Sequence, residues 1–586
     1  MTGRARRIGA RELLDALLDP GTFVSWDAPP IAVAHSAAYR SALADAAAAA
    51  GTDEAVRTGA GRLRGRRVAV IACEFAFLAG SVGVAAAERI VAAVERATAE
   101  GLPLIVSPTS GGTRMQEGTL AFVQMVKIAG AVAAHKSAGH PYVVYLRNPT
   151  MGGVFASWGS LGHITFAEPG ALIGFLGPRV YEALYGRPFP PGVQTAENLY
   201  HSGVIDGVVE VPVFRRIAHR ALSVFSGVPD EPPPAATGCR TATEPVASPR
   251  HRATDAAVAG DGDDTPTTSA SDSTDTEPST RRENGGDHRA VPRPEPPRAD
   301  PAAAESVTAP EISPSTTVPG SGAHPVAGAK LPQAWDSVLI SRRADRPGIR
   351  ELLRRSTQRV PLSGTGQGET DRTVVLALAR FRGRPCVVFG HDRAHQDPEH
   401  TMGPAALRSA RRSMQLAAEL RLPLVLVIDT IGAALSKEAE ERGLAPEIAR
   451  CIADLVTLDT PTVSVLLGQG TGGGALALLP ADRVLAATHA WLAPLPPEGA
   501  SAIVHRDTEH APELAARQRI RSVDLLADGI VDRIVPEYPD AAEEPDAFAH
   551  RMVTAIAGEL TGLAAQPPQR LRELRHRRYR RLGLPD

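Results

Sequence analysis

The chain has 586 residues, a hydrophobic content of 43% and a formal net charge of −2. This length is sufficient for two large domains with separate cores, and the nearly neutral charge gives no electrostatic reason to expect a nucleic-acid partner. The four cysteines are far apart in unlike contexts, which predicts neither a disulfide framework nor a zinc site. We expect Cys73, Cys386 and Cys451 to be small buried side chains and Cys239 to lie in a linker.

The N-terminal segment has the pattern of a short amphipathic helix. Leu13, Leu14, Leu17 and Leu18 follow helical spacing with charged residues between them, unlike the apolar core of a signal peptide. The apolar runs at 75–87 and 460–481 are too short or too interrupted by glycine and glutamine to span a membrane. The sequence therefore predicts a cytoplasmic protein that does not enter a membrane.

After a helical lead-in over residues 1 to about 60, the first half alternates strands and helices, which predicts a largely parallel sheet. The predicted strands are 67–74, 104–107, 142–147, 163–166, 171–174 and 205–210, and the predicted helices are about 81–100, 113–138 and 211–226. The first domain is thus expected to cover residues 1–228.

Residues 229–328 are rich in Pro, Ser, Thr, Ala, Asp and Arg and nearly free of aromatic residues. Such a composition cannot bury enough apolar surface to offset the entropy of ordering. We interpret this stretch as a long disordered linker.

The second domain, 329–586, repeats the alternation of the first. Its predicted strands are 374–379, 386–390, 424–428, 463–467, 483–486, 489–492 and 530–535, and its predicted helices are 335–355, 404–420, 443–458 and a basic C-terminal helix over 569–584. A basic helix of this kind is more typical of a solvated or subunit-contact face than of a nucleic-acid element.

A glycine turn stands at the end of one central strand. The strand at 104–107 runs into Ser110, Gly111 and Gly112 directly before the helix at 113–138. Glycine lets the backbone approach a ligand, and the first N–H groups of a helix lack internal partners. The turn is a candidate oxyanion hole, and the alternative is an ordinary tight turn between a strand and a helix.

The same plan occurs in both halves. Pro103 and Pro423, Pro141 and Pro461, and Gly153 and Gly473 stand in similar local sequences and are each 320 positions apart. One offset over a whole segment indicates a repeated fold. Two glycine-lined strand ends predict either one site with two oxyanion holes or two separate sites.

Several segments resemble a known family. In the first half they are Glu74–Gly83, Ser110–Glu117, Pro149–Val154 and Ala171–Val180, and in the second half Val427–Gly432, Ala439–Gly443, Gly468–Leu476, Pro497–Gly499 and His576–Leu582. The first set resembles the β subunit of bacterial acetyl-CoA carboxylase carboxyltransferase, and the second set resembles its α subunit. The chain is similar to a fusion of the two, with the linker excluded.

The resemblance implies an α/β fold of two crotonase-like βα-repeat domains that transfer a carboxyl group from carboxybiotin to acetyl-CoA, giving malonyl-CoA. Carboxybiotin would be supplied by a separate biotin carboxyl carrier protein, charged by biotin carboxylase, so no cofactor is expected in this chain. Gly111 and Gly112 would stabilise the acyl-CoA enolate, and Gly473, Gly474 and Ala475 the ureido oxygen of biotin. Biotin's own nitrogen would take the α-proton.

Further residues are implied as substrate contacts: Gly152, Gly153, Glu498 and Gly499. Arg114, Arg147 and Arg179 are candidate cations for CoA phosphates, with surface ion pairing as the alternative role. In the family the site forms between the first domain of one protomer and the second domain of another. The expectation is therefore a homo-oligomer with shared sites.

Some positions depart from the family pattern. The β subunit usually begins with a four-cysteine zinc ribbon, but no cysteine precedes Cys73, so no metal is expected. In the second half Ile431 and Ala434 replace the usual proline and tyrosine of one loop.

Two alternatives to an acetyl-CoA carboxyltransferase stay open. One is a carboxyltransferase for propionyl-CoA or another acyl-CoA, and the other is a non-catalytic paralogue with an assembly or regulatory role.

Overall fold

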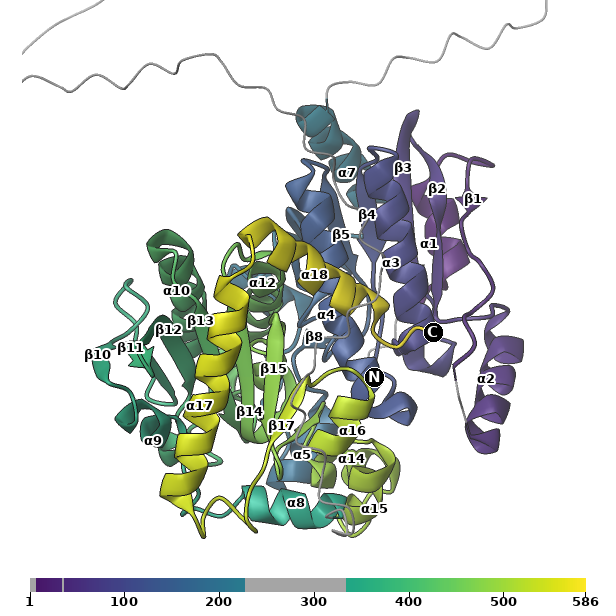
Figure 1. Cartoon of the computed structure of the whole chain (residues 1–586). Helices are drawn as coiled ribbons and strands as arrows, with labels where there is room; N and C mark the ends of the chain where they lie inside the picture. The colour runs from purple at the N-terminus through teal and green to yellow at the C-terminus, as the bar shows by residue number, and fades with distance from the viewer. Residues whose placement is uncertain (1–6, 34–35, 227–332, 586) are drawn as a thin grey trace, which may run out of the picture. The chain divides into compact units, whose positions relative to one another are not determined.

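The computed structural model describes residues 7–33, 36–226 and 333–585 (Figure 1). The predicted linker and Cys239 lie outside these residues. The described parts of the two halves pack against each other as one unit.

The first half is built on a sheet of order β1-β2-β3-β4-β5-β7-β9. Pairing is antiparallel from β1 to β3 and parallel from β3 to β9, and β6 and β8 form a separate parallel pair. The strands are β1 (Val24–Ser25), β2 (Val56–Leu63), β3 (Arg66–Cys73), β4 (Leu104–Ser107), β5 (Tyr142–Leu146), β6 (Thr150–Met151), β7 (Ile164–Ala167), β8 (Ile173–Gly174) and β9 (Gly207–Val208).

The helices of this half connect and cover these strands. They are α1 (Ala10–Leu17), α2 (Ala37–Ala50), η1 (Leu78–Gly80), α3 (Val84–Ala99), η2 (Met115–Glu117), α4 (Gly118–Ser137), η3 (Trp158–Ser160), α5 (Pro178–Tyr185), α6 (Ala196–His201) and α7 (Val211–Ser226). Leu13, Leu14, Leu17 and Leu18 are buried, as the amphipathic pattern predicted.

The helical lead-in was predicted too long, because β1 and β2 lie within it or at its end. Strand β2 contains Gly59, where a Cβ atom would lie 2.3 Å from the carbonyl oxygen of Val24 on β1. A glycine within a strand often marks such a close backbone approach. Glycine also weakens the usual strand pattern, which explains why the sequence did not reveal this element.

The second half repeats the plan with the order β10-β11-β12-β13-β14-β15-β17, and β16 pairs with β14. Pairing is antiparallel from β10 to β12 and parallel beyond. The strands are β10 (Gln358–Leu362), β11 (Val374–Phe381), β12 (Arg384–His391), β13 (Leu424–Thr430), β14 (Thr462–Thr471), β15 (Arg483–Ala487), β16 (Trp491–Ala493) and β17 (Arg533–Val535). All of β13 is buried, as is typical of a central parallel strand.

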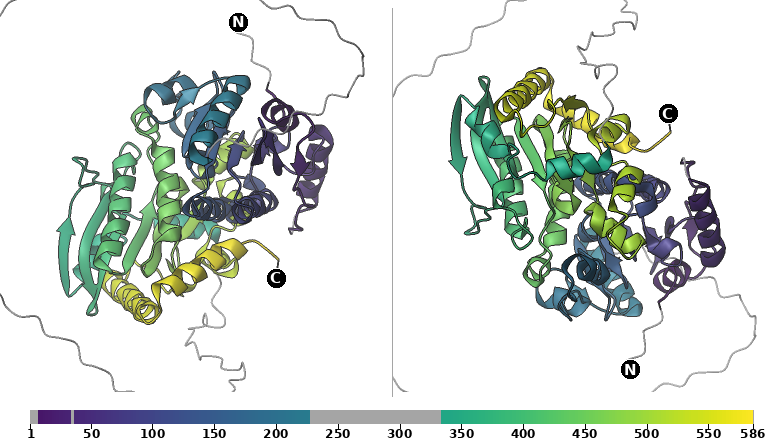
Figure 2. Two further views of the ribbon diagram at one scale, coloured as in Figure 1. Left: turned by 90° about the horizontal axis from the view of Figure 1, so that it is seen from above. Right: turned by 90° about the horizontal axis from the view of Figure 1, so that it is seen from below.

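The helices of the second half include α17, which packs on β11, β12, β14 and β17 (Figure 2). The bounds are α8 (Ala334–Ser341), α9 (Ile349–Arg354), η4 (Arg393–His395), α10 (Pro404–Leu420), α11 (Lys437–Glu441), α12 (Leu444–Thr457), α13 (Gly472–Leu476), α14 (Pro497–Val504), α15 (Ala511–Arg517), α16 (Ser522–Ala527), α17 (Pro545–Ala564) and α18 (Pro568–Arg581). The helix predicted at 335–355 is two helices, α8 and α9.

Helix α4 is the apolar core helix of the first half. With η2 it forms a stretch, Met115–Ser137, that is long and apolar enough to cross a membrane. However, 83% of its most apolar window is buried within the protein, where α4 packs against α3 and α12. A helix that is hydrophobic all round is expected in such a position, so its composition reflects core packing between the two halves.

Cys73, Cys386 and Cys451 are free and buried, as predicted. Burial raises the pKa of the Cys73 thiol to about 11 and that of Cys386 to about 12. These thiols are therefore protonated near neutral pH and do not act as nucleophiles.

Candidate active site

Equivalent glycine turns follow β4 in the first half and β13 in the second. Gly112 has φ +121° and Gly432 has φ +140°, backbone conformations that only glycine adopts without strain. The Ser110 hydroxyl accepts the N–H of Gly112 at 3.0 Å, and the Thr430 hydroxyl accepts the N–H of Gly432 at 3.1 Å. The two turns are 320 positions apart, so the internal repeat extends to the hydrogen bonding of these loops.

A second pair of turns follows β6 and β14. Gly152 has φ +64° and Gly472 has φ +63°, and these residues are again 320 positions apart. Each is followed by another glycine, Gly153 and Gly473. Each half thus brings two glycine turns to the carboxyl ends of its strands, the edge at which ligands bind in parallel α/β sheets.

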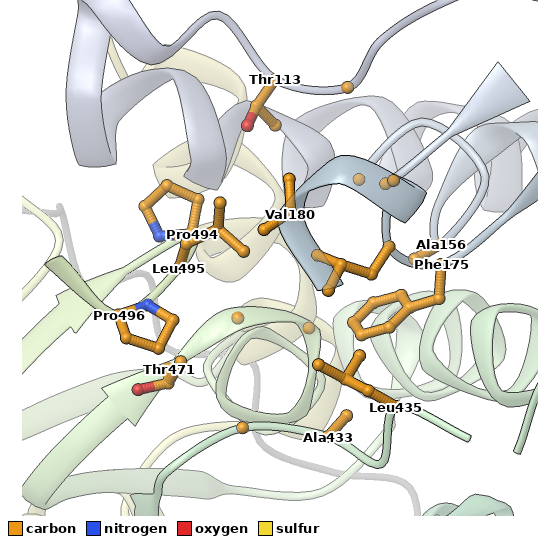
Figure 3. Close-up of a pocket in the computed structure, with 18 of the residues that line it drawn as sticks. Thr113, Ala156, Phe175, Val180, Ala433, Leu435, Thr471, Pro494, Leu495 and Pro496 are labelled. Atoms are coloured by element: carbon orange, nitrogen blue, oxygen red, sulfur yellow. The ribbon is translucent and has the colours of Figure 1, made fainter. Parts of the chain in front are cut away.

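The turns of both halves line one cavity of about 370 Å³ (Figure 3). Its remaining wall is mostly apolar and comes from both halves. The lining includes Gly111, Gly112, Gly152, Gly153, Phe175, Leu176, Val180 and Leu184 from the first half, and Ile431, Gly432, Leu435, Ile448, Gly472, Gly473, Leu495 and Pro496 from the second. The volume lies in the range of small-molecule sites.

The main-chain donors at this cavity are not those expected from the sequence. The N–H of Gly111 donates to the carbonyl of Ala79 at 2.9 Å, and the N–H of Gly112 donates to Ser110. Both glycines therefore form part of the cavity wall, but their N–H groups already donate hydrogen bonds within the protein. This corrects the prediction that they stabilise an oxyanion: the acceptors are the carbonyl of Ala79 in η1, 32 residues before Gly111, and the hydroxyl of Ser110.

Gly153 is the donor that the first half offers instead. It lines the cavity, and none of the hydrogen bonds found among the described residues uses its N–H. In the second half, Gly473 and Gly474 belong to the first turn of α13, where N–H groups have no intrahelical acceptor. The cavity can thus receive one anionic oxygen from each side.

The predicted second-half residues occupy different depths. Gly473 lines the cavity, whereas Gly474 and Ala475 are buried behind it, and a Cβ on Gly474 would lie 3.3 Å from the sulfur of Met402. The sequence reasoning missed Gly432 and Gly472. The offset of 320 from Gly112 and Gly152 would have identified both.

Two of the three candidate arginines are structural. Arg114 is 1% exposed and forms two hydrogen bonds with Glu54, at 2.5 and 3.1 Å. Arg147 is also buried and donates to the carbonyl of Cys73 at 2.5 Å. Neither can reach a CoA phosphate, which corrects that expectation. The side chain of Arg179 lies outside the described part of the chain.

The contacts of Glu498 and Gly499 also differ from the substrate-binding role predicted for them. Glu498 forms hydrogen bonds at 2.6 and 3.0 Å with Arg342. Burial opposes its ionisation, but the hydrogen bonds and the positive charge of Arg342 together outweigh burial and lower the pKa of Glu498. A Cβ on Gly499 would lie 3.3 Å from Leu184 of α5. Both residues fix α14 in place and do not line the cavity.

Family models match both halves. A model described as carboxyl transferase domain covers residues 5–240, and one described as acetyl co-enzyme A carboxylase carboxyltransferase-like covers 329–583. A Mycobacterium tuberculosis protein named probable biotin-dependent acyl-coenzyme A carboxylase beta3 subunit is 57% identical over 99% of both chains. A Salinispora arenicola protein named acetyl-coenzyme A carboxylase carboxyl transferase subunits beta/alpha is 34% identical over 99% of this chain and 92% of its own length.

These matches define the class of protein: the chain belongs to the carboxyltransferase family of biotin-dependent acyl-CoA carboxylases. The prediction of two α/β domains with a largely parallel sheet in each is confirmed by the two sheets of the structure. A solved transcarboxylase 12S structure aligns with 96% of this chain and 90% of that chain, at 18% identity and a TM-score of 0.33. The family assignment rests on the sequence matches.

Proposed function

We propose that this chain transfers a carboxyl group from carboxybiotin, presented by a separate carrier protein, to the α-carbon of an acyl-CoA. The observation that carries this proposal is the single cavity at which glycine turns of both halves meet. Carboxyl transfer develops negative charge on two oxygens, the thioester oxygen of the acyl-CoA and the ureido oxygen of biotin. A site with main-chain donors on two sides suits that reaction.

Each half then has a separate task. The N–H of Gly153 holds the thioester oxygen as the acyl α-carbon loses its proton, and the N–H of Gly473 holds the ureido oxygen. Carboxybiotin, bound as a substrate, supplies both the carboxyl group and the nitrogen that takes the proton. The apolar lining excludes water, which would otherwise compete for the carboxyl group.

Acetyl-CoA is the first candidate substrate, because the beta/alpha relatives are named for it. A longer acyl-CoA is the second candidate, because the cavity wall is mostly apolar and the 57% identical relative is named for acyl-CoA in general. We also propose that the chain works with a biotin carboxylase and a biotin carrier protein. It would do so as a homo-oligomer in the cytoplasm.

The purified chain can be tested alone in the reverse direction. With malonyl-CoA and free biotin it should release acetyl-CoA, and methylmalonyl-CoA in place of malonyl-CoA tests the second candidate. No biotin-dependent turnover of either substrate would favour the non-catalytic alternative.

Gly153→Val tests the donor assignment. A Cβ at this position would already lie 3.0 Å from the methyl group of Thr113, so the larger side chain displaces the turn. Loss of one such donor slows transfer by about 10²–10³-fold. Gly558→Ala, at a helix position with nothing within 4 Å, is the matched control and should keep full activity. Near-normal turnover in a folded Gly153→Val chain would contradict the assignment.

A further inference from the structure

Phe175 is the residue that touches a glycine turn of each half. It follows β8 and lines the cavity (Figure 3). Its carbonyl oxygen lies 3.9 Å from where a Cβ on Gly152 would be, and its ring carbon Cε2 lies 2.9 Å from where a Cβ on Gly473 would be. The ring therefore occupies the space that a side chain at position 473 would need, and one residue bridges the two oxyanion sites.

Glu440 of the second half holds Phe175 in this position. Its Oε1 atom accepts the backbone N–H of Phe175 at 2.8 Å and the side-chain amide of Gln194 at 2.6 Å. Gln194 also donates to the carbonyl of Leu176 at 2.8 Å. Glu440 is 5% exposed, so these bonds across the two halves are shielded from water. A carboxylate accepting several N–H groups orders the segment that carries them.

The position of Phe175 matters for the acyl group. In the proposed function, which this inference extends, the acyl α-carbon lies between the first-half and second-half turns. Carbons beyond it must then point toward the side wall of the cavity. Phe175 forms the part of that wall that spans the two turns, beside the side chain of Leu435 (Figure 3). Ile448 contributes to the same wall, next to Gly473.

We propose that Phe175 is a specificity-determining residue that limits the length of the acyl chain, and that Glu440 is the positioning residue that holds it across the boundary between the halves. The substrate class that follows is a short-chain acyl-CoA. Removing the ring opens room for carbons beyond the α-carbon and removes a contact that orients the smallest substrate.

The test compares Phe175→Ala and Phe175→Leu with the parent chain on acetyl-, propionyl-, butyryl- and hexanoyl-CoA. We expect the ratio of kcat/KM for hexanoyl-CoA to that for acetyl-CoA to rise about tenfold or more in Phe175→Ala, the size of effect that a few methylenes have in an apolar pocket. Phe175→Leu should give a smaller rise. Phe225→Ala, which shortens an exposed phenylalanine of α7, is the matched control.

The role of Glu440 is tested by comparing substitutions at Glu440 and at its neighbour Glu441. Glu440→Ala removes the oxygen that accepts the N–H groups of Phe175 and Gln194, and it should move the chain-length ratio in the same direction as Phe175→Ala and lower kcat for acetyl-CoA. Glu441→Ala removes the neighbouring carboxylate, which bonds to Asn198 and not to Phe175, and should leave the ratio unchanged. A merely structural role of Glu440 would lower stability without moving the ratio.

Binding of the same acyl-CoA series, measured by calorimetry without biotin, provides a readout independent of turnover. If the parent chain transfers carboxyl groups but the Phe175 variants keep its chain-length profile in both assays, the specificity role is wrong and the proposed function stands. If the parent chain neither binds nor carboxylates any acyl-CoA of the series, both proposals are overturned.

Discussion

At the scale of single residues, burial and pairing decide which charged groups are available for chemistry. Arg114 follows the glycine turn directly and looks in sequence like a ligand-binding cation. In the structure its guanidinium is buried against Glu54, at 2.5 Å, and also bonds to the carbonyl of Ser81 at 2.8 Å. It fixes the loop before α4 from behind, while the glycines in front of it line the cavity.

Replacing Arg114 by methionine should therefore destabilise the fold rather than weaken CoA binding. It leaves the Glu54 carboxylate buried without its partner, which costs about 3–5 kcal/mol. Chemical denaturation measures this loss, and the KM for acyl-CoA of any folded fraction should stay near the parent value. A large rise in KM with unchanged stability would restore a role in phosphate binding.

The buried carboxyl group of Glu440 should make the free energy of unfolding depend on pH. Burial raises its pKa to about 7, although bonds from Gln194, Phe175 and Leu176 act in the opposite direction. Because the folded state holds this proton more tightly than the unfolded state, the free energy of unfolding should decrease as pH rises from about 4.5 to about 7, by up to about 3 kcal/mol.

Denaturation curves of the parent chain and Glu440→Gln over this pH range isolate the effect, since other carboxylates contribute equally to both. The difference in stability between the two should change with pH and become constant above about pH 8. Glu441→Gln serves as the control. A constant difference over the whole range would show that Glu440 has an ordinary pKa.

At the scale of elements, the C-terminal helix α18 joins the halves. It packs on α4 and α12 (Figure 1), and Arg580 near its end bonds to Glu88 at 2.7 Å and Glu95 at 2.7 Å, both on α3. Glu88 also accepts a bond from Lys127 at 2.6 Å. The basic helix predicted at the end of the chain thus contacts the first half through one of its arginines.

Arg580→Met should weaken this junction, because Glu88 and Glu95 lose the positive charge that balances them. We expect the free energy of unfolding to fall by about 1–3 kcal/mol. Arg577→Met, at an exposed position of the same helix, should change it by less than about 0.5 kcal/mol. Equal effects of the two substitutions would mean that the ion pairs of Arg580 do not stabilise this junction.

At the scale of the whole molecule, the structure places the glycine turns of both halves around one cavity of a single chain. This differs from the expectation that the first domain of one protomer faces the second domain of another. The residues that bridge the halves, Phe175 with Glu440 and Asn198 with Glu441, all come from the same chain. In this arrangement one chain supplies both sides of the cavity, and the shared site expected from the sequence stays a prediction.

Mixing two inactive variants tests this arrangement. A Gly153→Val chain and a Gly474→Val chain each carry one damaged half, so sites built within single chains stay inactive in the mixture. The measurement is turnover after the mixture has been dissociated and reassembled, with exchange of subunits verified by differently tagged chains. Recovery of about a quarter or more of the parent activity would show that the halves pair between chains.

Local sequence was enough to predict much of this architecture. The alternation of apolar strands and helices predicted most elements of both sheets, and the offset of 320 positions revealed the repeat and the turns at Gly153 and Gly473. These features depend on neighbours in the chain, since strand and helix periodicity and the need for glycine at a positive φ are local properties.

The hydrogen bonds and ion pairs of each functional group depended on contacts between segments that are distant in the chain. The N–H of Gly111 is used by Ala79, Arg114 is neutralised by Glu54, and Glu440 reaches Phe175 across the boundary of the halves. Hydrogen bonding and desolvation are set by whichever atoms the fold brings within about 3 Å. No local pattern encodes those partners, so the donors of the site and the wall at Phe175 could be identified only once the two halves were packed together.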